Sequence, residues 1–229
     1  MPSLFHSTLR SITVTRVLDR LFRSAEETDG IILSHARSEA EKRGAANDSD
    51  LADLFTEAFL PVPREMGELL YILARSQSSR NIVEFGTSFG ISTIYLASAV
   101  RDNGGGRVIT TELNTNKARR ARENLDEAGL GDLVEIREGD ALLTLRDLDA
   151  WIDMLLLDGW KNLYLPVLQC VESRLRPGAL VIADDLDIFP EAHKPYLEYV
   201  RHSVNGYFSV EIPLGDRIEL SLRNAAQSQ

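Results

Sequence analysis

The pattern of apolar positions alternates between buried strands and amphipathic helices from about residue 64 onwards. Apolar runs such as "IDMLLLD" and "ALVIAD" show little alternation, which is typical of strands covered on both faces. The pattern predicts strands at Asn81–Phe85, Arg107–Thr111, Leu133–Glu138, Trp151–Leu157 and Ala179–Ala183. It predicts helices between or after them at Ile91–Val100, Asn114–Ala128, Ala141–Leu145, Lys161–Leu175 and Glu191–Val200. Strands that alternate with helices in this way indicate a mostly parallel sheet with helices on both faces.

The end of the chain breaks the alternation. Two further strands, Tyr207–Pro213 and Asp216–Leu222, lie too close together for a helical crossover, so they are predicted to pair antiparallel. The predicted fold class is therefore α/β. We expect a Rossmann-like, doubly wound and mostly parallel sheet of seven strands, with the last one antiparallel and extra helices at the N-terminus.

The N-terminal part has a helical pattern of its own. We predict helices over 18–42 and 50–59, and a third, Arg64–Ser76, that leads into the first strand. Residues 1–60 are accordingly predicted to form a helical extension, and residues 61–229 the main domain. The first 25 residues are rich in Ser, Thr and Arg and poor in acids, a composition that faintly resembles a transit peptide. The preferred interpretation is an amphipathic helix that covers the active site or forms a homodimer with a partner subunit.

The composition excludes several classes of function. With 44% hydrophobic and 26% charged residues, the chain is typical of a soluble globular protein, and it has no apolar run long enough to span a membrane. A net charge of −10 argues against non-specific binding of nucleic acid. A single cysteine, Cys170, suits a reducing compartment, so a cytoplasmic location is expected.

The segment "IVEFGTSFGIST", residues 82–93, satisfies two different signatures. As G-x-S-x-G it would be the nucleophile elbow of a serine hydrolase, with Ser88 as the nucleophile. As a glycine-rich turn between a strand and a helix it would hold a nucleotide-like cofactor. The hydrolase needs a downstream histidine, and the only candidates, His193 and His202, are both predicted to lie inside a helix.

Other residues favour the cofactor. Glu112 follows the second strand, where a carboxylate can accept both hydroxyls of a ribose. The glycine pattern lacks the G-x-G-x-x-G expected for a pyrophosphate, and no lysine follows it as in a P-loop. A cofactor with an adenosine but no phosphate fits this combination, and S-adenosylmethionine is such a molecule. Gly86 would let the backbone approach its methionine moiety, and the helix that begins near Ile91 would offer amides to the carboxylate.

Acidic residues stand at or directly after the carboxyl end of all five predicted parallel strands. They are Glu84, Glu112, Asp140, Asp158 and the pair Asp184 and Asp185. Ligands of doubly wound sheets bind at this edge. A single acid in a turn is most often a helix cap, but five on one edge are harder to explain by capping.

Several motifs together resemble the class I S-adenosylmethionine-dependent O-methyltransferases, and in particular the catechol O-methyltransferase family. The motifs are "VEFGTSFGIST", "TTELN", "EGDAL", "LLLDGWKNLYLP" and "LRPGALVIADD". "DGWKNLYLP" is the most specific of them, and the resemblance covers roughly residues 60 to 222. It implies cofactor-binding positions at Val62, Glu84, Gly86, Ser92, Glu112, Asp140, Asp158 and Trp160.

The resemblance also implies a metal site and a catalytic base. Asp158, Asp184 and Asp185 match the three side-chain ligands of a divalent cation, normally magnesium, and Lys161 matches the base. The family usually has asparagine where this chain has Asp185. A third carboxylate should strengthen cation binding, but it adds negative charge beside an acceptor that must become an oxyanion.

The expected chemistry is methyl transfer to a hydroxyl. Magnesium prefers oxygen ligands and can hold two neighbouring substrate hydroxyls, which favours a small, catechol-like substrate. Lys161 lies one helical turn from Asp158, close enough to take a proton. Two alternatives stay open: a metal-independent methyltransferase, in which the three acids only shape the pocket, and a module that binds the cofactor without turnover.

Overall fold

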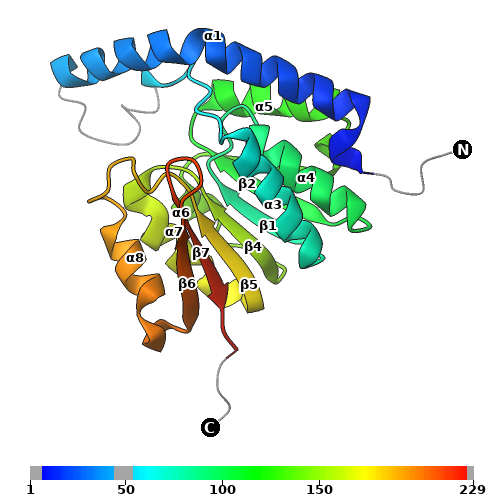
Figure 1. Cartoon of the computed structure of the whole chain (residues 1–229), viewed down its shortest axis with the longest axis vertical. Coiled ribbons are helices and arrows are strands. Elements are labelled where there is room, and N and C mark those ends of the chain that lie inside the picture. Colours follow the sequence, from blue (N-terminus) through cyan, green and yellow to red (C-terminus); the bar gives the residue numbers. More distant parts are fainter. Residues whose placement is uncertain (1–6, 44–53, 226–229) are drawn as a thin grey trace, which may run out of the picture.

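The fold is centred on a seven-stranded sheet, seen in a computed structural model that describes residues 7–43 and 54–225. The strands are β1 (Asn81–Phe85), β2 (Arg107–Glu112), β3 (Val134–Glu138), β4 (Ile152–Leu157), β5 (Leu175–Ala183), β6 (Tyr207–Ile212) and β7 (Ile218–Arg223). Their order is β3-β2-β1-β4-β5-β7-β6 (Figure 1). β1 to β5 are parallel, and β7 is antiparallel to both of its neighbours. The predicted fold class is confirmed.

Helices cover both faces of this sheet. One face packs against α1 (Ile12–Arg43), α3 (Arg64–Ser76), α4 (Ile91–Asp102) and α5 (Thr115–Glu127). The other packs against α6 (Ala141–Thr144), α7 (Tyr164–Val171) and α8 (Lys194–Arg201). Ile82 of β1 belongs to the first core and its neighbour Val83 to the second. Successive side chains of a strand point to opposite faces, so a strand between two cores needs apolar residues at consecutive positions.

Some predicted boundaries differ from the structure. α1 begins at Ile12, six residues before the predicted start, and the predicted helix over 161–175 is divided. It becomes the 3-10 turn Lys161–Leu163, α7, and the 3-10 turn Glu172–Arg174, and β5 begins at Leu175. Of the helix predicted over 50–59, residues 50–53 lie outside the described part, and residues 55–57 form a turn.

The two candidate histidines of the hydrolase hypothesis were also placed wrongly. His193 is the residue that precedes α8, and His202 is the residue that follows it. His193 is only 2% exposed, and burial lowers its pKa.

α1 packs against α4 and α5 and runs along the side of the molecule that these helices form (Figure 1). Its apolar residues Val14, Val17, Leu18 and Leu21 are buried in the same core as α3 and α4.

Within the described residues, no helix is long and apolar enough to cross a membrane. The boundary at residue 60 stays a prediction.

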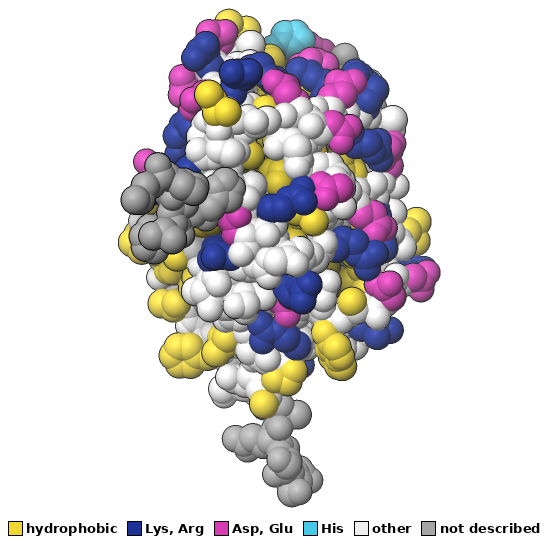
Figure 2. Space-filling view, turned by 90° about the vertical axis from the view of Figure 1, so that its right-hand side faces the viewer, with side chains coloured by type: hydrophobic (Ala, Val, Ile, Leu, Met, Phe, Trp, Pro, Cys, Tyr) yellow, Lys and Arg dark blue, Asp and Glu magenta, His cyan; other side chains and the backbone are white. Residues whose placement is uncertain are grey.

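The surface carries both signs of charge. On the face seen in Figure 2, basic and acidic side chains are interspersed. Several form exposed pairs, among them Arg101 with Asp132 and Arg119 with Glu123.

Candidate active site

A cavity of about 840 Å³ lies at the carboxyl ends of the parallel strands. Its volume falls within the roughly 300–1,000 Å³ typical of small-molecule sites. All but one of the residues predicted for the site line it: Val62, Gly86, Ser92, Glu112, Asp140, Asp158, Trp160, Lys161, Asp184 and Asp185. The parallel register brings the strand ends to one edge, which gathers residues as far apart in the chain as Gly86 and Asp185.

Glu84 is the exception, because it lies beneath the cavity instead of in its wall. Its side chain is completely buried, and Oε2 accepts a hydrogen bond from the Thr93 hydroxyl at 2.5 Å. Its Oε1 has no hydrogen-bond partner in the described part of the chain. Burial raises the pKa of this carboxyl, and hydroxyl donors such as Ser92 and Thr110 oppose that change.

The turn after β1 requires glycine at position 86. Gly86 has φ +104°, and a Cβ added to it would come within 2.5 Å of the Asp158 carbonyl oxygen. The amide of Asp158 in turn donates to the Phe85 carbonyl at 2.8 Å. The close approach of the two chains at the ends of β1 and β4 therefore leaves no room for a side chain. The same approach forms the floor of the cavity.

Glu112 ends β2 and is fixed by backbone amides. Its Oε1 accepts from the Asn114 amide at 2.9 Å, and its Oε2 from the Ser88 amide at 2.8 Å. A carboxylate has about four lone-pair sites, so both oxygens can still accept from a ligand. Burial raises the pKa of Glu112, while the amides and the charge of Lys117 oppose this effect.

Two residues beside Glu112 have roles that the sequence analysis missed. Lys117 of α5 is only 6% exposed and lines the cavity, with Nζ 3.3 Å from the Ser88 hydroxyl oxygen. Burial lowers the pKa of Lys117, and Glu112 and Asp29 raise it. Ser88, with φ +47°, donates its hydroxyl to the Phe59 carbonyl at 2.6 Å. Ser88 is therefore more than a small loop residue. No histidine among the described residues lines the cavity beside it, as a serine hydrolase would need.

Asp140 and Trp160 line another part of the cavity. The Asp140 carboxylate caps α6 by accepting from the Leu142 amide at 2.8 Å. Trp160 lies after β4, and its ring centroid is 6.2 Å from that of Phe55. Phe55 comes from the segment before α3, so aromatic side chains from distant parts of the chain meet here.

Lys161 is held at the other end of the cavity by two contacts. Its Nζ donates to the Tyr164 hydroxyl oxygen at 2.8 Å and to Asp185 Oδ2 at 2.9 Å. The Tyr164 hydroxyl donates onwards to the Asp184 carbonyl at 2.9 Å. Lys161 is 9% exposed, so the ion pair with Asp185 is largely shielded from solvent.

Three carboxylates crowd the same end. Asp184 Oδ1 accepts from the Asp185 amide at 2.9 Å, while the buried Oδ2 has no partner in the described part of the chain. Burial and the neighbouring charges of Asp184 and Asp185 raise the pKa of Asp158 well above its ordinary value. Among the described residues, no three His, Cys, Asp or Glu side chains stand in the geometry of a preformed metal site, and Asp185 contacts Lys161 instead.

The rest of the cavity wall is mostly apolar and, apart from Leu163, comes from segments outside the quoted motifs. It includes Leu33 of α1, the run from Phe59 to Val62, Leu163, and Ile188 and Phe189 of the loop after β5. Asp216, at the turn between β6 and β7, adds a carboxylate to this end. Sequence patterns could place these residues in loops or helices, but could not bring them together.

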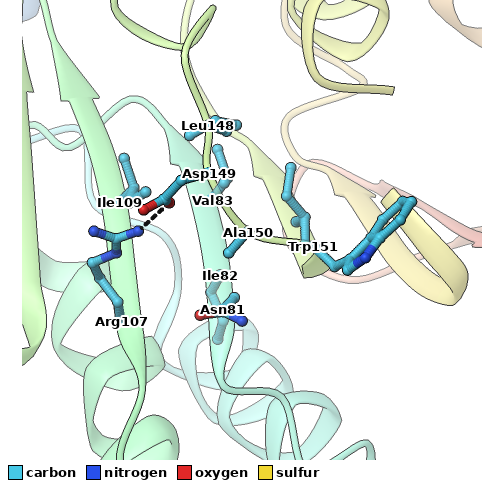
Figure 3. A pocket seen from close by; sticks show the side chains of 10 residues that line it. Asn81, Ile82, Val83, Arg107, Ile109, Leu148, Asp149, Ala150 and Trp151 are labelled. Carbon is cyan, nitrogen blue, oxygen red and sulfur yellow. Dashed lines mark hydrogen bonds and ion pairs between the residues drawn. The ribbon is translucent and has the colours of Figure 1, made fainter. Parts of the chain in front are cut away.

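A second, much smaller cavity lies at the opposite end of the strands (Figure 3). It measures about 10 Å³, room for about one water molecule. Arg107 and Asp149 form an ion pair at 2.7 Å beside it. This cavity is too small for a substrate or cofactor.

Comparisons with known proteins show which family this chain belongs to. A family model described as a methyltransferase domain matches residues 83–186. The catechol O-methyltransferase of Niastella koreensis is 36% identical over 152 residues, which cover 62% of this chain and 68% of that protein. Catechol O-methyltransferase B of Danio rerio is 30% identical over 209 residues, 84% of this chain and 74% of that protein.

Solved structures extend the likeness to the whole fold. The O-methyltransferase TomG of Streptomyces achromogenes, involved in tomaymycin synthesis and solved in complex with S-adenosylmethionine, matches with a TM-score of 0.67 and 27% identity. The match covers 85% of this chain and 90% of that one. An O-methyltransferase from Bacillus cereus, in complex with S-adenosylhomocysteine, has the same fold with a TM-score of 0.68 and 22% identity, covering 90% of this chain and all of that one.

Proposed function

Because this chain belongs to the S-adenosylmethionine-dependent O-methyltransferases of the catechol O-methyltransferase family, we propose that it methylates a hydroxyl of a small, catechol-like acceptor. The acceptor oxygen would attack the methyl carbon while the bond from that carbon to the cofactor sulfur breaks. The acceptor loses its proton, and S-adenosylhomocysteine is the second product. The observation that supports this most is that Glu112 and Lys161 line one and the same cavity.

The cofactor would lie along the floor of the cavity. Glu112 would accept the ribose hydroxyls with the lone pairs that its two backbone donors leave unused. Val62, Gly86 and Ser92 would hold the methionine end of the cofactor. Ser92 lies in the first turn of α4. Asp140 and Trp160 would enclose the adenine. Asp158 would lie between the cofactor and the acceptor, and Glu84 would support the floor from beneath.

The acceptor would lie between the apolar wall and the Lys161 end. Phe189 and Leu60 offer apolar and aromatic surface to a flat ring. Lys161 would remove the proton from the hydroxyl that is methylated. Lys161 Nζ contacts Asp185 here, so it can turn to the acceptor hydroxyl only when another cation balances that carboxylate.

Magnesium, or another divalent cation, is proposed as the balancing charge, with Asp158, Asp184 and Asp185 as ligands. The donor set suits it, because magnesium prefers carboxylate oxygens, and Asp184 Oδ2 is a buried oxygen without a partner among the described residues. When bound, such an ion would hold the acceptor hydroxyls and acidify them. Asp185 would exchange its contact with Lys161 for the ion.

The ion pair also supports a second candidate, a metal-independent O-methyltransferase. In that enzyme Lys161 would neutralise Asp185 permanently and hold the acceptor by charge alone.

One experiment separates these possibilities. Transfer of labelled methyl is measured for catechol, a catechol with a cationic side chain and a catechol with an anionic side chain, with and without chelator. Metal dependence predicts that chelator abolishes transfer and that added magnesium restores it. Full transfer in chelator would favour the metal-independent enzyme, and binding of the cofactor without transfer to any acceptor would favour a non-catalytic module. Because Asp184, Asp185 and Asp216 oppose Lys161 at this end, we expect the anionic acceptor to be the poorest.

A homodimer through the N-terminal helix is proposed separately. Ile12 and Ile31 of α1 are 75% and 77% exposed, which leaves apolar side chains on that helix outside the core of the chain. The predicted cytoplasmic location rests on the composition alone.

A further inference from the structure

One wall of the cavity is a segment that has no regular structure of its own. Residues 58–62 form neither helix nor strand, yet Phe59, Leu60 and Val62 all line the cavity. Pro61 and Pro63 have no amide hydrogen, so the segment has few backbone donors. Its position must therefore depend on side chains from elsewhere in the fold.

Asp29 of α1 holds this wall from one side. Its Oδ1 accepts from the Phe59 amide at 2.8 Å, and its Oδ2 accepts from the Leu60 amide at 2.9 Å. Asp29 is only 8% exposed, so these charged hydrogen bonds are shielded from water and strengthened. Leu60 has φ +49°, a backbone region that leucine rarely adopts. The two bonds help to offset that strain.

The turn after β1 holds the same wall from the opposite side. The Ser88 hydroxyl donates to the Phe59 carbonyl at 2.6 Å, and the Ser88 amide donates to Glu112 Oε2 at 2.8 Å. The Phe59 ring stacks on that of Phe89, with 4.2 Å between the centroids. The backbone around Phe59 is thus fixed between α1 and the residues that hold Glu112.

We propose that Asp29 is a positioning residue of the active site, which couples the docking of α1 to cofactor binding. It sets the distance between the Phe59–Val62 wall and Glu112, and so the width of the space in which the cofactor lies. Leu33, one turn further along α1, lines the cavity itself. The inference rests on the proposed function in one respect, that the cofactor occupies this cavity.

Coupling of this kind is reciprocal. If the contact of Asp29 with the wall favours cofactor binding, bound cofactor must favour that contact equally. The amides of Phe59 and Leu60 report on it directly, because they donate to Asp29 and exchange their hydrogens with solvent only when that contact opens.

The test compares Asp29→Asn and Asp29→Ala with the control Glu26→Gln in the full-length chain. Glu26 is an exposed acid on the same helix, so its replacement removes the same charge without touching the wall. We expect Asp29→Ala to weaken S-adenosylhomocysteine binding about tenfold by calorimetry. Asp29→Asn should lie between it and the wild type, because a carboxamide can accept only one of the two amides. Glu26→Gln should bind as the wild type does.

Hydrogen exchange measures a change that a purely structural role of Asp29 would not produce. The Phe59 and Leu60 amides should exchange faster in Asp29→Asn than in the wild type, and saturating S-adenosylhomocysteine should restore much of their protection. Unchanged affinity in Asp29→Asn, or exchange at these amides that the ligand does not slow, would overturn the inference.

A second variant covers the case in which the Asp29 variants do not fold. Ser88→Ala releases the same peptide from the other side, and it should also weaken binding and speed exchange at Phe59 and Leu60. Normal affinity and normal exchange in Ser88→Ala would overturn the inference. Failure of the wild type itself to bind S-adenosylhomocysteine would instead refute the proposed cofactor site, and the inference with it.

Discussion

Asp185 shows how much one side chain can decide at the residue scale. It has φ +60°, a conformation that asparagine and aspartate tolerate better than most residues. The family usually has asparagine at this position, so the backbone requirement is met by either residue. The carboxylate, however, binds Lys161 at 2.9 Å, an ion pair that a neutral amide cannot form. Whether the enzyme needs a metal therefore depends on position 185, where a carboxylate oxygen of aspartate stands in place of the amide nitrogen of asparagine.

We expect Glu112→Gln to weaken S-adenosylhomocysteine binding by about 1–3 kcal/mol, because buried ribose hydroxyls would lose a charged acceptor. Burial raises the pKa of Glu112, so wild-type affinity should fall as the pH is lowered through that raised value. Glu112→Gln should lack this fall. Calorimetry over a pH series, with the exposed Glu123→Gln as control, measures both effects. Equal affinities for Glu112→Gln and wild type would remove Glu112 from the site.

Lys161→Ala should lower turnover by roughly 10²–10⁴-fold, the usual contribution of a general base, with cofactor affinity nearly unchanged. Lys161→Arg should be equally poor, since a guanidinium stays protonated at working pH. Initial rates with acceptors of graded acidity check the role, because an acceptor that is already ionised needs the base less. An active Lys161→Arg enzyme would exclude the base role, and equal losses along the series would indicate that Lys161 only positions the acceptor.

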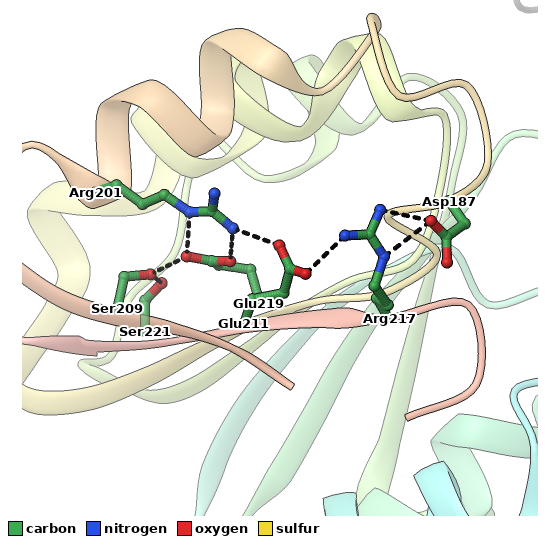
Figure 4. Close-up of polar contacts among 7 residues, drawn as sticks. All are labelled: Asp187, Arg201, Ser209, Glu211, Arg217, Glu219 and Ser221. Carbon is green, nitrogen blue, oxygen red and sulfur yellow. Dashed lines mark hydrogen bonds and ion pairs between the residues drawn. The ribbon is translucent and has the colours of Figure 1, made fainter. Parts of the chain in front are cut away.

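At the scale of elements, charged side chains fasten the C-terminal hairpin to its neighbours (Figure 4). Arg217, between β6 and β7, donates to Asp187 Oδ1 at 2.8 Å and to Glu211 Oε1 at 2.6 Å. Asp187 lies in the loop that carries Ile188 and Phe189 into the cavity. The hairpin therefore sets the position of the acceptor wall as well as completing the sheet.

Arg201 of α8 extends the same network to a buried acid. Its Nε donates to Glu219 Oε1 at 2.8 Å, and Glu219 is fully buried. Arg201→Ala should lower the free energy of unfolding by about 2–3 kcal/mol, because it leaves a buried charge without its cation. Denaturant unfolding measures this. The exposed Arg119, paired with Glu123 on α5, is the control, and its replacement by alanine should cost less than about 0.5 kcal/mol. Similar small losses in both variants would show that Glu219 does not depend on Arg201.

The features predicted most accurately from the sequence are those that depend on the local pattern of apolar and polar residues. The apolar runs predicted the strand core at Ile152–Leu157, and the bounds of α3 were predicted correctly. The acids at the strand ends were predicted to share an edge, and they line one cavity apart from Glu84. Asp29 and Lys117 were not found, because each sits in a helix whose pattern makes a charged residue look solvent-exposed. Their burial depends on which distant segment packs above them, and no local pattern encodes that.

At the scale of the whole molecule, the exposed apolar side chains of α1 are the proposed contact between two copies of the chain. We expect the wild type to have about twice the 25.5 kDa of one chain, and Ile31→Glu to reduce that mass to one chain, measured by light scattering after size exclusion. Ile72→Glu, at an exposed isoleucine of α3, should leave the mass unchanged. A wild type of single-chain mass, or dissociation by Ile72→Glu alone, would refute association through α1.

The place of β7 in the sheet has a consequence for synthesis on the ribosome. Of the seven strands in this sheet β7 is made after the other six, yet it is inserted between β5 and β6. Until residues 218–223 emerge, β5 keeps an unpaired edge, and β6, already made, has no strand beside which to pair. Such an edge can recruit strands from other nascent chains. The growing polypeptide therefore exposes an unpaired strand edge from the time β5 has been made until residues 218–223 close it.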